Sequence, residues 1–243
     1  MNIYQQIFKK SAEGKKQFAI LIDPDKENED SLEALCELAN QYKVDYLFVG
    51  GSLLTQDCLS DCFEVIKLHT QIPVVLFPGD NLQINSHADA ILFLSLISGR
   101  NPDLLIGKHV ISAPILKDSG IEVVSTGYML IDGGTPTSVS YMSNTTPIPA
   151  NKRDIAVCTA MAGEMLGLKL IFMDAGSGAL NPVGENMISA VKKSIDIPLI
   201  VGGGIRSAEK AKAAFEAGAD VVVVGNAIES NKDLIREIAQ IIA

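Results

Sequence analysis

Eight short apolar runs recur along the chain, and polar or amphipathic segments separate them. They lie at residues 18–22, 45–50, 73–77, 90–94, 122–131, 169–173, 198–203 and 220–225. Most of these runs are continuously apolar and lack the alternation of a half-exposed strand, which predicts strands that are covered on both faces. Strands of this kind belong to parallel sheets, so each of them must be followed by a crossover connection.

Amphipathic segments provide most of these crossovers. Ser207 fits the N-cap of one of them, with Glu209 in its first turn and Gly218 at its end. The predicted helices cover residues 31–42, 154–166, 185–193, 207–217 and 231–242. Alternating strands and helices predict an α/β fold, a (β/α)8 TIM barrel, and a doubly wound sheet is the competing architecture.

Two connections depart from an ideal barrel. Residues 78–88, after the third run, are too few for a full crossover helix, so we expect the barrel to be modified around its third crossover. Residues 132–150, after the fifth run, are long and rich in Gly, Thr, Ser and Pro. Long loops at the C-terminal face of a barrel are usually functional, which predicts such a role here.

Length and composition narrow the class of protein. The 243 residues suit one TIM-barrel domain over 1–243, and 47% apolar residues argue against disorder. A net charge of −9 argues against nucleic acid as a partner. It also requires that an anionic ligand be held by local donors or by a metal. No apolar run approaches 18 residues, so we expect a cytoplasmic protein with at most peripheral membrane contact.

The seventh and eighth runs both end in glycine. Gly203 and Gly204 follow the seventh run, and Gly225 and Asn226 follow the eighth. In a barrel these two strand ends form a standard phosphate site. Glycine has no Cβ, so backbone N–H groups can approach an oxyanion closely. The alternative is that these glycines serve only to make tight turns.

The sixth run ends in a third glycine-rich turn. Asp174 stands at the end of that strand, and Gly176, Ser177 and Gly178 follow it. Three consecutive strand ends would then surround one phosphate-bearing ligand. A carboxylate beside such a ligand can orient or deprotonate a substrate hydroxyl. The alternative for Asp174 is a structural cap.

The first and second runs end in possible metal ligands. Asp23 follows the first run, and Ser52 follows the second. A carboxylate and a hydroxyl on adjacent strand ends suit Mg²⁺, which keeps water ligands and recruits phosphate oxygens. The alternative is that Asp23 only caps its loop.

Five motifs in this order resemble one known family along essentially the whole chain. The motifs are LIDPDK (21–26), FVGGS (48–52), FMDAGSGA (172–179), VGGGIR (201–206) and VVGNAI (223–228). They resemble the geranylgeranylglyceryl phosphate synthases, a family that includes the bacterial heptaprenylglyceryl phosphate synthases. The DAGSG form and the long loop at residues 135–149 are similar to the second of the family's two groups.

The resemblance implies a reaction and a set of ligands. The family is a TIM barrel that joins a polyprenyl diphosphate, geranylgeranyl diphosphate among them, to the primary hydroxyl of sn-glycerol 1-phosphate. The new bond is an ether, diphosphate is released, and Mg²⁺ is required. The resemblance further implies a homo-oligomer, either a dimer or a hexamer.

The resemblance also assigns residues. It places the metal at Asp23 and Ser52, and Tyr128 near the substrate beside Asp174. The residues that it implies for substrate binding are Phe172, Met173, Asp174, Ala175, Gly176, Ser177, Gly178, Gly203, Gly204, Gly225 and Asn226. This chain departs from the family at two positions. Many members carry Glu where Asp174 stands, and some carry Lys where Leu21 stands.

Other functions remain open at this stage. The same turns occur in sugar-phosphate isomerases and lyases, in enzymes that bind the FMN phosphate, and in non-catalytic glycerophosphate-binding proteins. A prenyl chain would need an apolar groove leading away from the strand ends. The candidates for this groove are Phe93, Leu96, Ile97, Ile111 and Tyr141, with packing in the core as the alternative.

Overall fold

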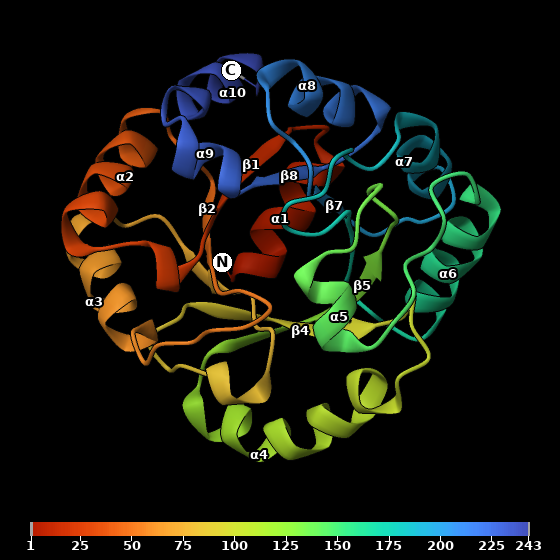
Figure 1. Cartoon of the computed structure of the whole chain (residues 1–243), viewed down its shortest axis with the longest axis horizontal. Helices are drawn as coiled ribbons and strands as arrows, with labels where there is room; N and C mark the ends of the chain where they lie inside the picture. The colour runs from red at the N-terminus through yellow and green to blue at the C-terminus, as the bar shows by residue number, and fades with distance from the viewer. Residues whose placement is uncertain (1, 243) are drawn as a thin grey trace.

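The computed structural model describes residues 2–242, and in these residues eight parallel strands close into one barrel (Figure 1). The strands are β1 (Gln17–Ile22), β2 (Tyr46–Val49), β3 (Val74–Leu76), β4 (Ala90–Leu96), β5 (Glu122–Leu130), β6 (Leu170–Asp174), β7 (Leu199–Gly202) and β8 (Val221–Val224). Each strand pairs with the next along the chain, and β8 pairs with β1. The predicted (β/α)8 barrel is confirmed, and the doubly wound alternative is wrong.

Helices accompany the strands, and most of them form a ring around the barrel (Figure 1). They are α1 (Ile3–Ala12), α2 (Glu29–Gln41), α3 (Leu59–His69), α4 (Lys108–Ser119), α5 (Ser138–Ser143), α6 (Arg153–Met165), α7 (Glu185–Lys192), α8 (Ala208–Ala217), α9 (Asn226–Ser230) and α10 (Asp233–Ile242). Ser207 caps α8 as predicted, because its side chain accepts from the N–H of Lys210. The predicted helix at 231–242 begins at Asp233, after the separate short helix α9.

The apolar runs are continuous because both faces of each strand are buried. In β1, Ala19 faces the barrel interior, while Phe18 and Ile20 pack under the helices. Phe18 and Ala19 are fully buried, and Ile20 is almost so. Burial of each large side chain of this kind contributes about 1.5–3 kcal/mol. The two layers together fix the register of the strands on which the loops at their ends depend.

Helix α1, which was not among the predicted helices, closes the N-terminal end of the barrel. It crosses the centre of the strand ring in Figure 1, and Ile3 and Ile7 pack among the interior side chains. The carboxylate of Glu122, at the start of β5, accepts from the N–H groups of Ile3 at 2.6 Å and Tyr4 at 3.0 Å. A carboxylate satisfies and neutralises the start of a helix in this way. With this end closed, the C-terminal ends of the strands are left for ligands.

The third and fifth connections are irregular, as predicted. Between β3 and β4 the chain forms only the 3-10 turn η2 (Asn81–Gln83), so no crossover helix covers the outer face of β4 there. After β5 the long loop folds into α5, and a parallel bridge between Ile131 and Ile148 ties its two ends together. Within residues 2–242, no helix is long and apolar enough to cross a membrane.

Candidate active site

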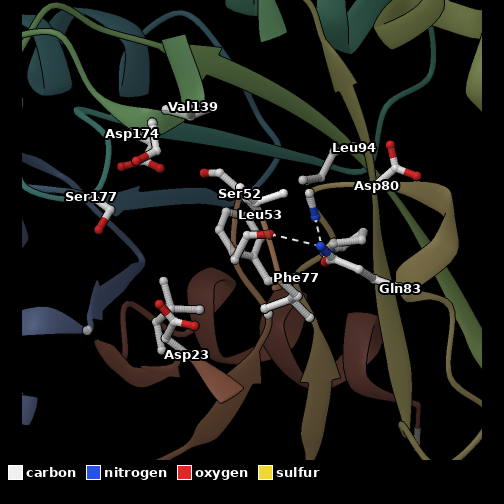
Figure 2. A pocket seen from close by; sticks show the side chains of 18 of the residues that line it. Asp23, Ser52, Leu53, Phe77, Asp80, Gln83, Leu94, Val139, Asp174 and Ser177 are labelled. Carbon is white, nitrogen blue, oxygen red and sulfur yellow. Dashed lines mark hydrogen bonds between the residues drawn. The ribbon is translucent and has the colours of Figure 1, made fainter. Parts of the chain in front are cut away.

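One cavity of about 1430 Å³ occupies the C-terminal ends of the strands. Its lining brings together Asp23 and Ser52 from one side of the barrel with Asp174 and the turns after β6, β7 and β8 from the other. Figure 2 shows Asp174 and Ser177 across the cavity from Asp23. Cavities for one small ligand usually measure about 300–1,000 Å³, so this one has room for two ligands or for one long one.

Glycine allows the turns after β6 and β7 to lie against each other. Gly203 has a φ of 77°, and a Cβ on it would lie 2.4 Å from Oδ1 of Asp174. The same Cβ would lie 2.6 Å from the backbone nitrogens of Ala175 and Gly176. Gly204 has a φ of 68°, and its Cβ would meet the backbone of Asn181. A side chain at either position would therefore push the two turns apart.

Polar side chains tie these turns together. Nδ2 of Asn226, after β8, donates to Oγ of Ser177, after β6, at 3.1 Å. Nη2 of Arg206, after β7, donates to the carbonyl oxygen of Ala179 at 2.8 Å. Arg206 was not among the predicted site residues, although it belongs to the VGGGIR motif. The three predicted strand ends thus form one connected wall, with a guanidinium at its edge.

Asp174 is buried at the centre of this wall. Its Oδ2 accepts from the hydroxyl of Tyr128 at 2.6 Å, and its Oδ1 accepts from the N–H of Gly176 at 2.7 Å. Burial raises the pKa of Asp174, and these two hydrogen bonds offset only part of that rise. Burial also raises the pKa of Tyr128 far above its ordinary value, so Tyr128 keeps its proton and donates a hydrogen bond to the carboxylate. A carboxylate with a raised pKa is suited to accept a proton.

The opposite side of the cavity carries Asp23 and a lysine. Asp23 caps the short 3-10 turn η1 (Pro24–Lys26), and its Oδ2 lies 3.1 Å from Nζ of Lys26. The same Nζ lies 3.3 Å from Glu229 and 3.4 Å from Oδ1 of Asn226. Burial lowers the pKa of Lys26, but contacts with Asp23 and Glu229 outweigh burial and raise it overall. Lys26 is therefore a fixed positive charge between the two sides of the cavity.

The donor set at Asp23 and Ser52 fits a magnesium ion that is completed by its substrate. Among residues 2–242, no group of three or more His, Cys, Asp or Glu side chains could hold a metal alone. Mg²⁺ does not need such a cage, because it keeps waters and usually binds one or two carboxylates together with substrate phosphates. Asp23 and Ser52 both line the cavity and offer one carboxylate and one hydroxyl.

An apolar arm of the cavity runs between β4 and α4. It exists because η2 replaces a helix on the outer face of β4. The residues that line it are Ile84, Ile91, Phe93, His109, Ser112 and Leu116. Nearer the mouth, the ring of Phe77 stacks on that of Phe172 with their centroids 5.2 Å apart. Phe77 was not predicted, although it directly follows the third strand.

Some of the predicted residues line the cavity and others do not. Phe93 and Leu96 line the cavity, as expected for a groove. Ile111 and Tyr141 are 62% and 86% exposed, and Ile97 does not line the cavity, so for these three the groove expectation is wrong. All predicted substrate-binding residues line the cavity except Met173 and Ala175, which pack in the outer core.

Comparison with known proteins places the chain in a family. Residues 11–242 match the PcrB family. A curated geranylgeranylglyceryl phosphate synthase from Chitinophaga pinensis is 59% identical over 237 residues, which make up 98% of this chain and 94% of that protein. Another, from Pyrococcus horikoshii, is 40% identical over 223 residues, or 91% of this chain and 87% of that protein.

A solved structure agrees with this placement. It is the (S)-3-O-geranylgeranylglyceryl phosphate synthase from Thermoplasma acidophilum, in complex with its substrate sn-glycerol-1-phosphate. The likeness has a TM-score of 0.94 at 32% sequence identity and covers 100% of this chain and 98% of that one. The family match, the relatives and this fold agree along the whole barrel, and the chain belongs to the PcrB family.

Proposed function

We propose that this protein is a Mg²⁺-dependent prenyltransferase that forms an ether bond between sn-glycerol 1-phosphate and a polyprenyl diphosphate. The observation that carries the proposal is a single cavity with three distinct parts. These are a glycine-rich wall beside a buried carboxylate, a carboxylate and hydroxyl suited to a metal, and an apolar arm. The relatives named geranylgeranylglyceryl phosphate synthase, and the neighbour that binds sn-glycerol-1-phosphate, support this assignment.

In the proposed reaction, the wall holds the acceptor alcohol. Backbone groups of Gly203, Gly204 and Gly225, with the side chains of Ser177 and Asn226, bind its phosphate. This places its primary hydroxyl beside Asp174, which Tyr128 holds in position at 2.6 Å. Fixing the alcohol in line with the allylic carbon supplies much of the rate acceleration.

The chemical step is a substitution at the allylic carbon. The hydroxyl oxygen of the alcohol forms a bond to C1 of the prenyl chain as the bond from C1 to the diphosphate oxygen breaks. The diphosphate leaves with the bonding electron pair, and Asp174 accepts the hydroxyl proton. The double bond next to C1 delocalises the positive charge that develops there. Lys26, between Asp23 and Asn226, faces the negative charge that builds up on the diphosphate.

Asp23 and Ser52 would hold the metal. Mg²⁺ bound there would neutralise the diphosphate and stabilise its departure. We expect Asp23→Asn to reduce Mg²⁺-dependent turnover by about 10²-fold or more, as removal of one well-placed electrostatic group does. The KM for glycerol phosphate should change less than turnover, because Asp23 reaches the phosphate wall only through Lys26, whose Nζ lies 3.1 Å from Asp23 and 3.4 Å from Asn226. Normal turnover of this variant at low Mg²⁺ would remove Asp23 from the metal site.

Product identification tests the whole proposal. The purified protein is incubated with sn-glycerol 1-phosphate, Mg²⁺ and polyprenyl diphosphates of graded length, and the products are identified by mass. We expect a prenyl ether with one diphosphate released per bond. Omission of Mg²⁺ or use of the enantiomeric glycerol phosphate serves as the control. Failure of every diphosphate to yield an ether would refute the proposal.

We further propose that the protein forms a homo-oligomer, a dimer or a hexamer. The support is an exposed apolar face on α4 and on the segment before it, where Ile106, Val110 and Ile111 are each more than 60% exposed. Soluble monomers rarely leave large apolar patches open to solvent. Sedimentation velocity measures the assembly, and we expect Val110→Glu to shift it toward monomer. A wild-type protein that sediments as a monomer at all concentrations would refute this.

A further inference from the structure

Among the described residues, the segment that carries Ser52 lacks hydrogen bonds near its middle. Residues 50–58 join β2 to α3 without regular secondary structure. The segment is fixed at its start, where the N–H of Gly50 donates to the carbonyl oxygen of Ile22 at 3.0 Å. Nε2 of Gln83 also donates to the carbonyl oxygen of Gly51 at 3.2 Å (Figure 2). Within the described chain, residues 52–54 form no hydrogen bond of their own. Besides its packing against Gly79, the position of Ser52 therefore depends on what holds the near half and the far half of the segment.

One carboxylate holds that far half. Oδ2 of Asp25 accepts from the backbone N–H of Thr55 at 2.6 Å and from its hydroxyl at 2.8 Å. Oδ1 of Asp25 accepts from the N–H of Gln56 at 3.3 Å and from Sγ of Cys58 at 3.6 Å. Hydrogen bonds to an ionised group are roughly twice as strong as those between neutral groups. Four donors from three residues, Thr55, Gln56 and Cys58, make Asp25 the main anchor of this half.

Asp25 acts on the segment and not on the ligand. It does not line the cavity, whereas Asp23, Lys26 and residues 50–57 do. Asp23 and Asp25 belong to the same short turn, because Oδ1 of Asp23 accepts from the N–H of Asp25 at 3.3 Å. The turn after β1 thus carries one carboxylate that faces the cavity and a second that holds the neighbouring segment.

We propose that Asp25 is a positioning residue, which anchors residues 50–58 so that Ser52 keeps its place in the cavity lining, where it and Asp23 would hold the cation. The inference rests on the proposed function, because that function assigns the cation to Asp23 and Ser52. Loss of the anchor leaves Asp23 in place but releases Ser52. Affinity for Mg²⁺ should therefore fall, while the glycerol phosphate wall across the cavity keeps its geometry.

The test uses three variants of the full-length protein. Asp25→Asn keeps the shape of the side chain but turns an amide NH₂ toward donors of the segment. Thr55→Val removes one of the four donors and keeps the size of the residue. Asp61→Asn is the matched control, because this exposed aspartate on α3 forms no hydrogen bond or ion pair within the described chain.

Two measurements separate positioning from a general structural role. Hydrogen exchange of residues 52–56 in the metal-free protein reports on the anchor itself. Calorimetric titration with Mg²⁺ in the presence of inorganic diphosphate reports on the cation site. For Asp25→Asn we expect faster exchange confined to this segment and a Kd for Mg²⁺ raised about tenfold, as loss of hydrogen bonds to a charged group implies. Thr55→Val should give a smaller change in the same direction, with the KM for glycerol phosphate unchanged in both.

The contrary outcomes are distinct. If Asp25→Asn matches Asp61→Asn in both exchange and Mg²⁺ affinity, the anchor is refuted while the proposed function stands. If its KM for glycerol phosphate rises along with a drop in Tm, the role is general stability and the inference is also refuted. If Asp25→Asn does not fold, Thr55→Val decides between these outcomes. A wild-type protein that takes up no Mg²⁺ with diphosphate refutes the cation site itself, and the positioning role falls with it.

Discussion

At the scale of single residues, Asp174 is a buried carboxyl group, and burial disfavours its charged form. It is 7% exposed, and burial raises its pKa above the ordinary value of 3.8. A group whose pKa is raised in the folded protein stabilises the fold at low pH and loses that contribution as pH rises through the folded-state pKa. The buried charge of Asp174 therefore lowers the free energy of unfolding at any pH at which the carboxyl group is ionised.

We expect Asp174→Asn to separate activity from stability. Loss of the proton acceptor should lower kcat by about 10²-fold or more. The Tm should fall less near pH 8 than below pH 3.8, because at the higher pH the loss of the buried charge offsets the hydrogen bond that the amide can no longer accept. Steady-state kinetics and thermal unfolding over a range of pH measure both effects. A variant with normal kcat would show that Asp174 only caps its turn.

Gly225 tests the phosphate wall at one residue. A Cβ at this position would lie 3.2 Å from the carbonyl oxygen of Leu21 and 3.3 Å from its Cβ. Gly225→Ala should therefore shift the turn after β8 by a few tenths of an ångström and raise the KM for glycerol phosphate several-fold. The cost in stability should be about 1 kcal/mol. Gly184→Ala is the control, since nothing lies within 4 Å of its added Cβ, and equal KM values in the two variants would contradict the assignment.

At the scale of residues, strand ends allowed positions in the cavity lining to be predicted. Asp23, Ser52 and Asp174 were predicted from their places after apolar runs, and all three line one cavity. Met173 was included only as part of a continuous segment. The two-residue period of a strand puts Phe172 and Asp174 on one face and Met173 on the other, which the structure bears out. Asp25 and its partners escaped prediction because loop contacts between neighbouring strand ends leave no periodic pattern.

At the scale of elements, α1 offers a test that does not touch the cavity. Glu122 caps the start of α1 at the far end of the barrel through Ile3 and Tyr4. We expect Glu122→Gln to lower the free energy of unfolding by about 1 kcal/mol, the usual worth of a helix cap. All kinetic constants should stay at wild-type values. Urea unfolding measures the change, and Glu37→Gln on the exposed side of α2 is the control.

An equal stability of the Glu122 and Glu37 variants would show that α1 docks through its apolar contacts alone. Packing of this kind is also why α1 escaped prediction from the sequence. Ile3 and Ile7 are the only residues of α1 that are buried within the described chain, and two apolar positions make a weak helical pattern. Helix α4 was not predicted from the sequence for the opposite reason. It is apolar on its exposed side as well, with Val110, Ile111 and Ile115 all exposed, so no period marks its inner face.

At the scale of the whole molecule, the net charge of −9 opposes the two anionic substrates of the proposed reaction. The Debye length falls from about 30 Å at 0.01 M salt to about 8 Å at 0.15 M, so added salt screens this repulsion. We expect kcat/KM for glycerol phosphate to rise a few-fold over that range at constant free Mg²⁺. Initial rates at subsaturating glycerol phosphate measure it. A steep fall with salt would show that Lys26 and Arg206 dominate the field that the substrate meets.

The barrel as a whole was predictable because closure follows from repetition. Eight runs buried on both faces leave few arrangements besides a closed parallel barrel, and the short third connection was visible as a lack of residues between two runs. The apolar arm was not predictable residue by residue. Its walls come from β4 and α4. Which of their side chains point into the arm depends on how α4 packs when a crossover helix is missing.

Helix α1 closes the base of the barrel, and this limits the routes by which substrates and product can pass. Neither reactant can pass through the barrel, so both must enter at its C-terminal end. A long hydrocarbon chain that bound first would narrow the entrance for the small polar alcohol. The prenyl ether product must leave at the same end. Its hydrocarbon tail must then move from the apolar arm into water or directly into an acceptor. Departure of the product, rather than bond formation, is then the natural candidate for the slowest event in each cycle.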